Sequence, residues 1–356
     1  MRLSTVPENP AEWVALMFGQ VPTPLCDVII GPMLAKAVIA ASSLGIFDAL
    51  EQGPLAAGGV ASRCETDPDA TERLLRALSA SKYLHESYAP SPRPSLYRLT
   101  RASRRWLLAG ADKSLHYAML HRELDMRFME FGQYVRTGRG QDFHSEMQPE
   151  DWYVYHQGQA DQARLIAGEL VSNLRLPSGA TEMLDIGGGH GLYSLALCTH
   201  YPHLHARVLD LAIPLSGSLE RTKVPAWNQV TFVVADARSI VLAPSSADVV
   251  LIANLMHHFD EKTNRCLVQR VAGALKPGGI LVAMDLVRRP SSASGGQITT
   301  LMDLYFGAVS GAQLWELSDI RAWQEEAGLC PERPVSFRLL PDCKIQIARK
   351  PAPTGK

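Results

Sequence analysis

The chain has 356 residues, of which 46% are hydrophobic and 20% charged, and its formal net charge at pH 7 is -1. This composition is typical of a soluble globular protein of two domains, and the balanced charge argues against a general binder of nucleic acid, which carries a marked basic excess. The six cysteines form no C-x-x-C pair, so we expect no zinc cluster and no disulfide framework, and the cytoplasm as the compartment.

Helices are expected in the first fifty residues. Residues 1–10 are polar and lack the apolar core of a signal peptide. From residue 11 to residue 50 the pattern is helical, and apolar side chains cover nearly the whole circumference of residues 33–50, which predicts burial against a second subunit. Charged residues and a proline interrupt the apolar segment 25–50, so we expect a buried helix and no membrane span.

Short helices and a ribbon follow. The helices are expected at residues 55–64 and 69–79, and two small strands at 83–88 and 96–99 flank a turn rich in Pro and Ser at 90–95. Together these elements predict a winged helix within a domain of residues 1–110. Such modules often bind DNA, but Asp67, Asp69 and Glu72 lie in the region that would face the groove and would oppose phosphate, so we expect no nucleic-acid partner.

A helical connector is predicted from residue 111 to residue 176. It contains a long helix over 111–136 and another over 150–174, both dense in aromatic residues and histidines. Side chains of this kind could line a substrate pocket, and they could equally be ordinary core. The candidate pocket residues, including two from later in the chain, are His116, Phe128, Tyr153, His156, Met256 and Met302.

Strands and helices alternate in the domain that we place at residues 177–356. Buried strands are expected at 182–187, 206–211, 230–235, 247–253 and 279–285, a helix at 318–328, and a final hairpin at 335–340 and 344–349. This order predicts an α/β fold, a Rossmann-like doubly wound parallel sheet that ends in one antiparallel strand.

The first strand of that sheet leads into a glycine-rich turn. Gly187, Gly189 and Gly191 alternate with other residues, and an apolar helix opens at Leu192. Glycines at such positions let the backbone turn tightly against a ligand. The next strand ends in Asp210, roughly twenty residues further on, where a carboxylate can accept both hydroxyls of an adenosine ribose. The pattern therefore predicts a nucleotide-binding turn.

Two details favour S-adenosylmethionine over NAD. Leu192 stands where the dinucleotide fingerprint needs its last small residue, and Asp185 precedes the glycines, where an acid suits a cationic ligand and repels a pyrophosphate. Asp236 follows the third strand, where the adenine amino group would reach, although capping of the next turn is its other possible role. The candidate cofactor residues are Asp185, Gly187, Gly189, Asp210, Leu211, Asp236, Ala237 and Asn254.

The fourth strand leads into the predicted catalytic loop, residues 254–261, and the fifth ends in Asp285. Neighbouring strand ends bring His257 and Asp285 together, so the carboxylate can hold one imidazole nitrogen while the other faces the substrate. This pair is a candidate general base for a phenolic hydroxyl. Adjacent residues point in different directions, and we expect His257 rather than His258 to face the site.

These motifs together resemble the class I small-molecule O-methyltransferases of plant and bacterial secondary metabolism. The segments that carry the likeness are Leu184–Gly191, the strand end at Asp210, His257–Glu261 and Lys276–Gly279, after the winged-helix region. The resemblance implies a homodimer formed through the N-terminal helices, S-adenosylmethionine as methyl donor, a small-molecule acceptor and a catalytic histidine at His257. It also places Asp285 where the family has a glutamate that orients the histidine.

Departures from the family pattern leave alternatives open. Plant members read His-Asp-Trp where this chain has His257, His258 and Phe259, and the family's second glutamate has only Asp319 in its slot, with Glu316 offset. Some relatives methylate carbon, on an aromatic ring, an indole or a 2-oxo acid, and some hold a metal through this loop. No third ligand stands at a telling spacing, so we expect no metal. A winged-helix regulator that senses S-adenosylmethionine is a further alternative.

Overall fold

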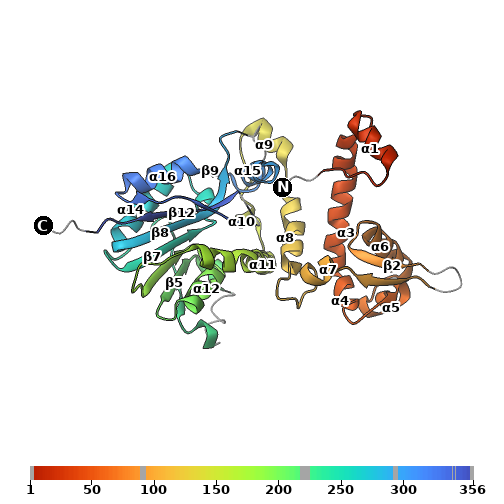
Figure 1. The fold of residues 1–356 in the computed structure, drawn as a ribbon, viewed down its shortest axis with the longest axis horizontal. Helices are drawn as coiled ribbons and strands as arrows, with labels where there is room; N and C mark the ends of the chain where they lie inside the picture. Colours follow the sequence, from red (N-terminus) through yellow and green to blue (C-terminus); the bar gives the residue numbers. More distant parts are fainter. Residues whose placement is uncertain are drawn as a thin grey trace. The chain divides into compact units, whose positions relative to one another are not determined.

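The structure is a computed structural model that describes residues 4–88, 94–216, 225–291, 296–338, 340 and 342–352. The chain divides into two compact units, residues 2–126 and residues 127–356. Helix α8 closes the N-terminal unit, and the helices from α9 onward belong to the C-terminal unit (Figure 1). The sequence-based division at residues 110 and 176 stays a prediction.

The N-terminal unit is mainly helical. Its helices are α1 (Pro10–Met17), α2 (Thr23–Leu25), the π-helix η1 (Cys26–Ile30), α3 (Gly31–Ser43), α4 (Ile46–Ala49), α5 (Ala57–Cys64), α6 (Pro68–Ala80), α7 (Arg101–Trp106) and α8 (His116–Arg127). Strands β1 (Leu55–Ala56), β2 (Leu84–Ser87) and β3 (Leu96–Leu99) pair in the order β1-β3-β2. Phe47, Leu75 and Tyr97 are buried at its centre. Helix, helix, helix and ribbon thus follow one another as the winged-helix prediction requires.

Two details of this unit differ from or extend the prediction. Residues 55 and 56 form a strand instead of opening a helix, because they pair with Tyr97 and Leu96 of β3. Asp67 caps α6 by accepting the Ala70 N–H at 2.8 Å, as its position before Pro68 predicts. Most of the predicted turn at 90–95 lies outside the described residues.

The N-terminal helices leave much of their apolar surface exposed. Trp13, Phe18, Val28 and Met33 are each more than half exposed, and in α3 burial is confined to Val38, Ile39, Ala41 and Ser42. The stretch Thr23–Ser43 is long and apolar enough to cross a membrane by length and composition alone. A single chain therefore does not bury all of the apolar side chains around residues 33–50, the region for which the sequence predicts burial against a second subunit.

The C-terminal unit is built on one large sheet. Its main strands are β4 (Glu182–Ile186), β5 (His205–Asp210), β6 (Val230–Val234), β7 (Ala247–Ala253), β8 (Leu275–Arg288) and β12 (Cys343–Arg349), with short β10 (Cys330–Pro331) at one edge. The order is β10-β12-β8-β7-β4-β5-β6, β11 (Val335–Ser336) pairs with β12, and β9 (Trp315–Glu316) pairs with β8. Strands β4 to β8 are parallel and β12 runs antiparallel to β8, which confirms the predicted fold class.

Helices cover both faces of this sheet (Figure 1). The helices among the described residues of this unit are α9 (Phe131–Thr137), α10 (Phe143–Glu146), α11 (Pro149–Asn173), α12 (Leu192–His200), α13 (Ala212–Ser216), η3 (Pro225–Trp227), η4 (Met256–His258), α14 (Glu261–Ala274), α15 (Gln297–Ser310) and α16 (Leu317–Glu326). The single helix predicted over 111–136 is wrong: the chain breaks after α8 and re-forms as α9. Helix α9 packs so closely on α15 that a Cβ on Gly307 would lie 2.4 Å from the Tyr134 hydroxyl oxygen.

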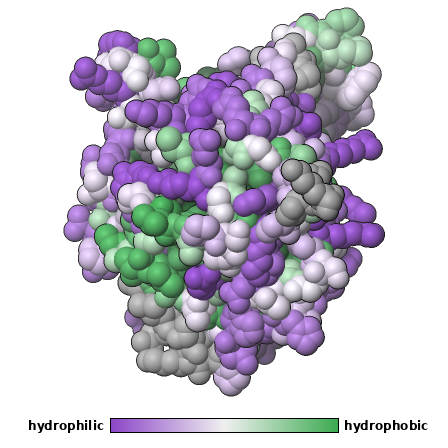
Figure 2. All heavy atoms as spheres, turned by 90° about the vertical axis from the view of Figure 1, so that its left-hand side faces the viewer, coloured by the Kyte–Doolittle hydropathy of each residue, from purple (hydrophilic) through white to green (hydrophobic). Residues whose placement is uncertain are grey.

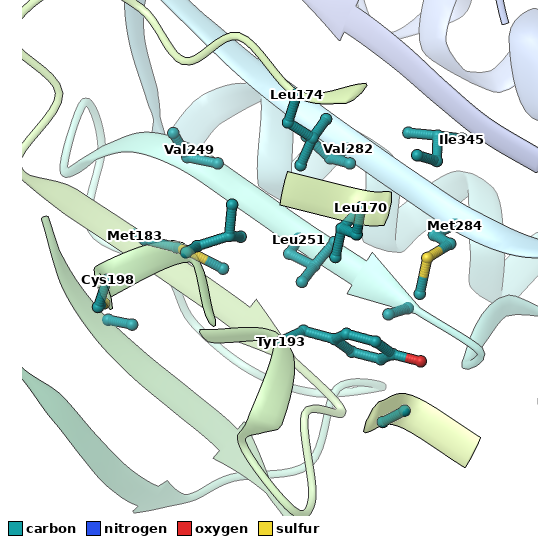
Figure 3. Close-up of a cluster of buried hydrophobic side chains, with 14 of the residues drawn as sticks. Leu170, Leu174, Met183, Tyr193, Cys198, Val249, Leu251, Val282, Met284 and Ile345 are labelled. Atoms are coloured by element: carbon teal, nitrogen blue, oxygen red, sulfur yellow. The ribbon is translucent and has the colours of Figure 1, made fainter. Parts of the chain in front are cut away.

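Two apolar clusters fill the space between sheet and helices. One lies under α11 and α12 and includes Leu170, Tyr193 and Leu251 (Figure 3). The other lies under α14 and α16 and includes Val250 and Trp323. Consecutive strand residues point to opposite faces, so the alternate residues 249 and 251 serve one cluster while 250 and 252 serve the other. The face drawn in Figure 2 is mostly hydrophilic, with hydrophobic patches between the polar side chains.

Candidate active site

The glycine turn between β4 and α12 packs closely on its neighbours. Gly187 and Gly191 have φ values of +73° and +69°, a region that side chains other than glycine rarely adopt. A Cβ on Gly187 would lie 2.8 Å from the Leu255 side chain, and one on Gly191 would lie 2.9 Å from Phe232. The sequence therefore needs glycine at both positions, both for the backbone conformation and for the space.

Asp210 at the end of β5 reaches across to this turn. Its Oδ2 accepts the Gly189 N–H at 2.9 Å and its Oδ1 accepts the N–H of Leu211 at 2.7 Å. Burial raises the pKa of Asp210, and the two backbone hydrogen bonds oppose that rise. The structure thus brings together the predicted Asp210, Gly189 and Leu211, with the Leu211 side chain 47% exposed beside them.

Asp185 lies beneath the turn, which differs from the expectation that it faces a ligand. The residue is fully buried, and a Cβ on Gly188 would lie 2.5 Å from its carboxyl carbon. Ser194 donates a hydrogen bond to Oδ2 at 2.6 Å, while Oδ1 has no hydrogen-bond partner among the described residues. Burial raises the pKa of Asp185 to about 7 against the opposing effect of the Ser194 hydrogen bond. The buried carboxylate would therefore interact with a ligand above the glycine turn electrostatically and without direct contact.

Asp236 follows β6 and does cap its turn. It accepts the Arg238 N–H at 2.8 Å, and the Arg238 guanidinium binds both carboxylate oxygens, which lowers the pKa of Asp236. Arg270 of α14 in turn donates to the carbonyl oxygens of Ala237 and Arg238, at 2.9 and 2.7 Å. The loop that contains the predicted residues Asp236 and Ala237 is therefore held from both sides, and contact with adenine stays a prediction.

Asn254 joins β7 to the predicted catalytic loop in a strained conformation. Its φ is +51°, which is uncommon for a residue other than glycine and often marks a functional site. Its N–H donates to the Met284 carbonyl oxygen at 2.8 Å, and its side chain is hydrogen-bonded to the buried hydroxyl of Tyr193. Asn254 is thus fixed from the sheet on one side and from α12 on the other.

His257 and Asp285 form the pair that the strand order predicts. His257 Nδ1 lies 2.8 Å from Asp285 Oδ1, and the backbone N–H of His257 donates to Oδ2 at 3.3 Å. Both side chains are buried, with 6% and 4% exposed. Because the carboxylate accepts, Nδ1 carries the hydrogen and Nε2 is left as the basic nitrogen. The ring of Phe306 stacks on the imidazole at 4.3 Å between centroids.

Glu316 and Asp319, the two candidates for the family's second orienting acid, have another role. They form a capping box at the start of α16, in which Asp319 Oδ2 accepts the Glu316 N–H at 3.0 Å. Among the described residues, Asp285 supplies the carboxylate hydrogen bonds to His257. Asp285 therefore fixes both the ring and the backbone of His257.

Hydrogen bonds to backbone carbonyl oxygens also hold the turn η4. The carbonyl oxygen of Met256 accepts from Asn264 Nδ2 at 2.9 Å and from Trp315 Nε1 at 3.0 Å, and that of His257 accepts the Gln313 N–H at 3.1 Å. With 1% of its surface exposed, the Met256 side chain belongs to the core under α14. Its place in a substrate pocket therefore stays a prediction.

A chain of ring contacts runs from the glycine turn to His257. Ring centroids lie 5.5 Å apart between His156 and Trp152, 5.6 Å between Trp152 and His144, and 5.4 Å between His144 and His258. A Cβ on Gly189 would lie 4.0 Å from His156 Nδ1. We call this set the aromatic wall; it consists of Phe143, His144, Trp152, Tyr155, His156, His258 and Phe306.

The wall includes some of the predicted pocket residues and omits others. His156 belongs to it, and Phe128 touches it through Phe143 at 5.9 Å between centroids. Met302 lies one helical turn before Phe306 on α15. Tyr153 is 53% exposed, and His116 lies in the N-terminal unit, so their roles stay predictions.

The sequence analysis did not single out Phe306, His144 or Trp152 as site residues. His144 and Trp152 lie in a region that is dense in aromatic residues. Their ring contacts across α10, α11 and η4 are what distinguish them from ordinary core residues, and the sequence does not show those contacts. Among the described residues there is no group of three or more His, Cys, Asp or Glu side chains able to hold a metal.

Comparison with known proteins adds the family. Residues 126–329 match the O-methyltransferase domain and residues 26–109 match the O-methyltransferase dimerisation domain. The chain is 26% identical to 3-hydroxy-5-methyl-1-naphthoate 3-O-methyltransferase of Streptomyces sahachiroi, over 89% of this chain and 92% of that protein. It is 29% identical to the N,N-dimethyltransferase OxyT of Streptomyces rimosus, over 83% and 86%.

Among solved structures, human N-acetylserotonin methyltransferase in complex with S-adenosylmethionine superposes with a TM-score of 0.83. The match covers 98% of this chain and 100% of that one at 20% identity, so it shows a shared fold. The match to the O-methyltransferase domain covers more than half of the sequence. Together with the glycine turn, the buried His257–Asp285 pair and the sheet that carries them, it shows that this chain belongs to the O-methyltransferase family.

Proposed function

We propose that the protein transfers the methyl group of S-adenosylmethionine to a hydroxyl group of a small aromatic acceptor in secondary metabolism. The observation that carries the proposal is the His257–Asp285 pair, 2.8 Å apart and buried at the same sheet edge as the glycine turn and Asp210. The naphthoate O-methyltransferase among its relatives supports an aromatic hydroxyl as the acceptor.

The residues around the glycine turn suit this cofactor, and we call them the donor end. Asp210 Oδ1 and Oδ2, which accept the N–H groups of Leu211 and Gly189, would accept the ribose hydroxyls. Asp185 has an unpartnered buried oxygen, and its negative charge suits a ligand that carries an ammonium and a sulfonium group. The same charge would oppose the pyrophosphate of a dinucleotide. Asp236, Ala237 and Asn254 are the proposed contacts for the rest of the nucleoside.

His257, Asp285 and the aromatic wall make up the acceptor end. S-adenosylmethionine supplies an electrophilic methyl group when it is bound. His257 Nε2 accepts the proton of the acceptor hydroxyl, and Asp285 stabilises the resulting imidazolium through Nδ1. The wall would orient a flat acceptor with its reacting oxygen toward the bound donor, and positioning of this kind contributes more to the rate than a general base.

A screen of acceptors tests this function. The purified protein is incubated with donor carrying a labelled methyl group and with phenols, indoles or 2-oxo acids, each with and without chelator. Transfer to phenols that is unaffected by the chelator is the expected result. Transfer only to indole or 2-oxo acid carbon, or loss of activity on chelation, would replace the proposal by carbon methylation or by a metal-dependent reaction.

We also propose a homodimer. The exposed apolar faces of α1, η1 and α3 lie at or next to the segment that matches the dimerisation domain, and a second copy would cover them. A dimer interface accounts for an apolar helix without a membrane, and the acids at α6 disfavour DNA. All six cysteines are free thiols, which suits the cytoplasm. Light scattering of the purified protein tests the dimer.

A further inference from the structure

His258 is a second imidazole next to the catalytic one. Both residues lie on the short turn η4, and their ring centroids are 4.2 Å apart with the ring planes tilted by 43°. On its other sides the His258 ring contacts His144 at 5.4 Å and Phe306 at 6.4 Å. Its ring is therefore part of the acceptor end, and the residue is partly buried.

The nitrogens of His258 are not used by the fold. Among the described residues, His258 forms no side-chain hydrogen bond, whereas His257 is fixed by Asp285. Burial, followed by the neighbouring imidazoles of His257 and His144, lowers the pKa of His258 well below its ordinary value. A neutral imidazole offers one N–H donor and one acceptor nitrogen. A polar group that a bound ligand shields from water without supplying a partner costs free energy, and a ligand that supplies the partner avoids that cost.

The position of the His258 imidazole indicates which kind of ligand could supply its hydrogen-bond partner. If the acceptor hydroxyl is at His257 Nε2, the 4.2 Å spacing of the two imidazole centroids would set His258 beside the next ring position of the acceptor. An oxygen on the next ring carbon is the acceptor atom that would be within its reach. An acceptor with a single oxygen would leave the His258 N–H unsatisfied in a water-poor site.

Resting on the proposed function, we propose that His258 selects acceptors that have two oxygens on neighbouring ring positions, donating its N–H to the oxygen that is not methylated. The substrate class is thus an aromatic diol or a hydroxy-carbonyl compound of the same spacing. His258 is the specificity-determining residue, and His257 remains the base.

Paired acceptors test the inference. The kcat/KM for naphthalene-2,3-diol is compared with that for 2-naphthol, at a saturating concentration of donor. The wild-type protein should prefer the diol by about tenfold or more, since one hydrogen bond in a dry site discriminates by this order. In His258→Phe, which keeps a ring against His257 but removes the N–H, the ratio should collapse toward one. His258→Asn, which restores a donor, should recover part of the preference.

The matched control is His203→Phe, at an exposed histidine just before β5, at the opposite end of that strand from Asp210, which should leave the ratio unchanged. Donor affinity, measured by calorimetry in every variant, reports on folding. Equal kcat/KM values of the wild type for the diol and for 2-naphthol, or a preference that survives in His258→Phe, would overturn the inference and leave the proposed methylation of hydroxyl groups in place. If neither acceptor is methylated while the donor binds, the proposed function is overturned, and the inference with it.

Discussion

The donor end and the acceptor end of this active site are built in different ways. Apart from the loop at 236–237 and Asn254, the donor end comes from residues 185–191 and 210–211, the ends of two paired strands. The aromatic wall takes its rings from α10, α11, η4 and α15, which span residues 143 to 306. A ligand site can therefore be recognised in a sequence when it is built from short motifs at the ends of neighbouring strands. It cannot be recognised in this way when helices far apart in the sequence assemble it.

The two ends also differ in what holds them in place. Backbone geometry holds the glycine turn, because Gly187 and Gly191 leave no space for a side chain. Side-chain anchors hold the acceptor end, since α15 places Phe306 on His257 and is itself fixed near its start and at its middle. Thr299 donates to Asp342 at 2.6 Å, and Asp303 accepts the Leu314 N–H at 2.7 Å. Substitutions at each end should therefore have separable effects.

The largest expected effect is that of His257→Ala. Removing the base should lower kcat by about 10²- to 10⁴-fold with a phenol acceptor, while the Kd for S-adenosylmethionine stays within about twofold of the wild-type value, because the donor end is intact. Stopped-flow or steady-state kinetics and calorimetry measure the two quantities. His203→Ala, at an exposed position, is the control. Equal losses in kcat and in donor affinity would show that the two ends are not separable.

Asp185→Asn tests the donor end through pH. Burial raises the pKa of Asp185 from 3.8 to about 7 in the folded chain, so between about pH 4 and pH 7 the folded state holds a proton that the unfolded state has lost. The free energy of unfolding should fall as the pH rises through this window, by at most about 4 kcal/mol, and stay level above it. Denaturant titrations of the Asn variant should lack this slope.

The same group should link donor binding to pH. A cation above the turn favours the ionised carboxylate, so the Kd of the wild type for S-adenosylmethionine should weaken as the pH falls below 7. The Asn variant should bind more weakly at pH 8 and show a flatter pH profile, with kcat at saturating donor little changed. A wild-type Kd that does not change between pH 6 and pH 8 would contradict this role for Asp185.

Asp342→Ala tests the anchor of α15. The carboxylate accepts from Arg289 Nε at 2.8 Å and from Thr299 Oγ1 at 2.6 Å; these bonds outweigh the effect of burial and lower the pKa of Asp342. We expect a loss of about 2 kcal/mol in the free energy of unfolding, as for hydrogen bonds to charged groups. The KM for the acceptor should rise while the Kd for the donor is kept. Asp112→Ala, at an exposed position in the N-terminal unit, is the control.

The smallest effect is expected for Phe306→Leu. The stacked ring holds the His257 imidazole in place at 4.3 Å, and such a contact contributes about 0.5–1.5 kcal/mol. The variant should therefore lose about 2- to 10-fold in kcat, and Phe306→Tyr, which keeps the ring, should lose less. An unchanged kcat in the Leu variant would mean that Asp285 alone positions the base.

Much of the fold could be predicted from the sequence because its signals are local. The strand at 247–253 has the predicted bounds, and the strand that ends in Asp210 is displaced by one residue. The order of parallel strands then brought His257 beside Asp285, although 28 residues separate them. Local patterns did not indicate the break between α8 and α9 or the strand at 55–56, since both arise from packing on distant partners, α15 and β3.

The candidate site divides in the same way between features that local sequence patterns predict and features that long-range packing decides. The sequence alone determined the glycine turn, the acid after the second strand and the His257–Asp285 pair, because strand ends at one sheet edge must meet. Only the tertiary structure decided that Met256 belongs to the core, that Phe306 stacks on His257, that Asp185 lies beneath the turn, and that, in the part of the chain that the structure describes, the His258 nitrogens form no hydrogen bond beside His257. These properties depend on which side chains fill the space around each residue, and long-range packing sets that space.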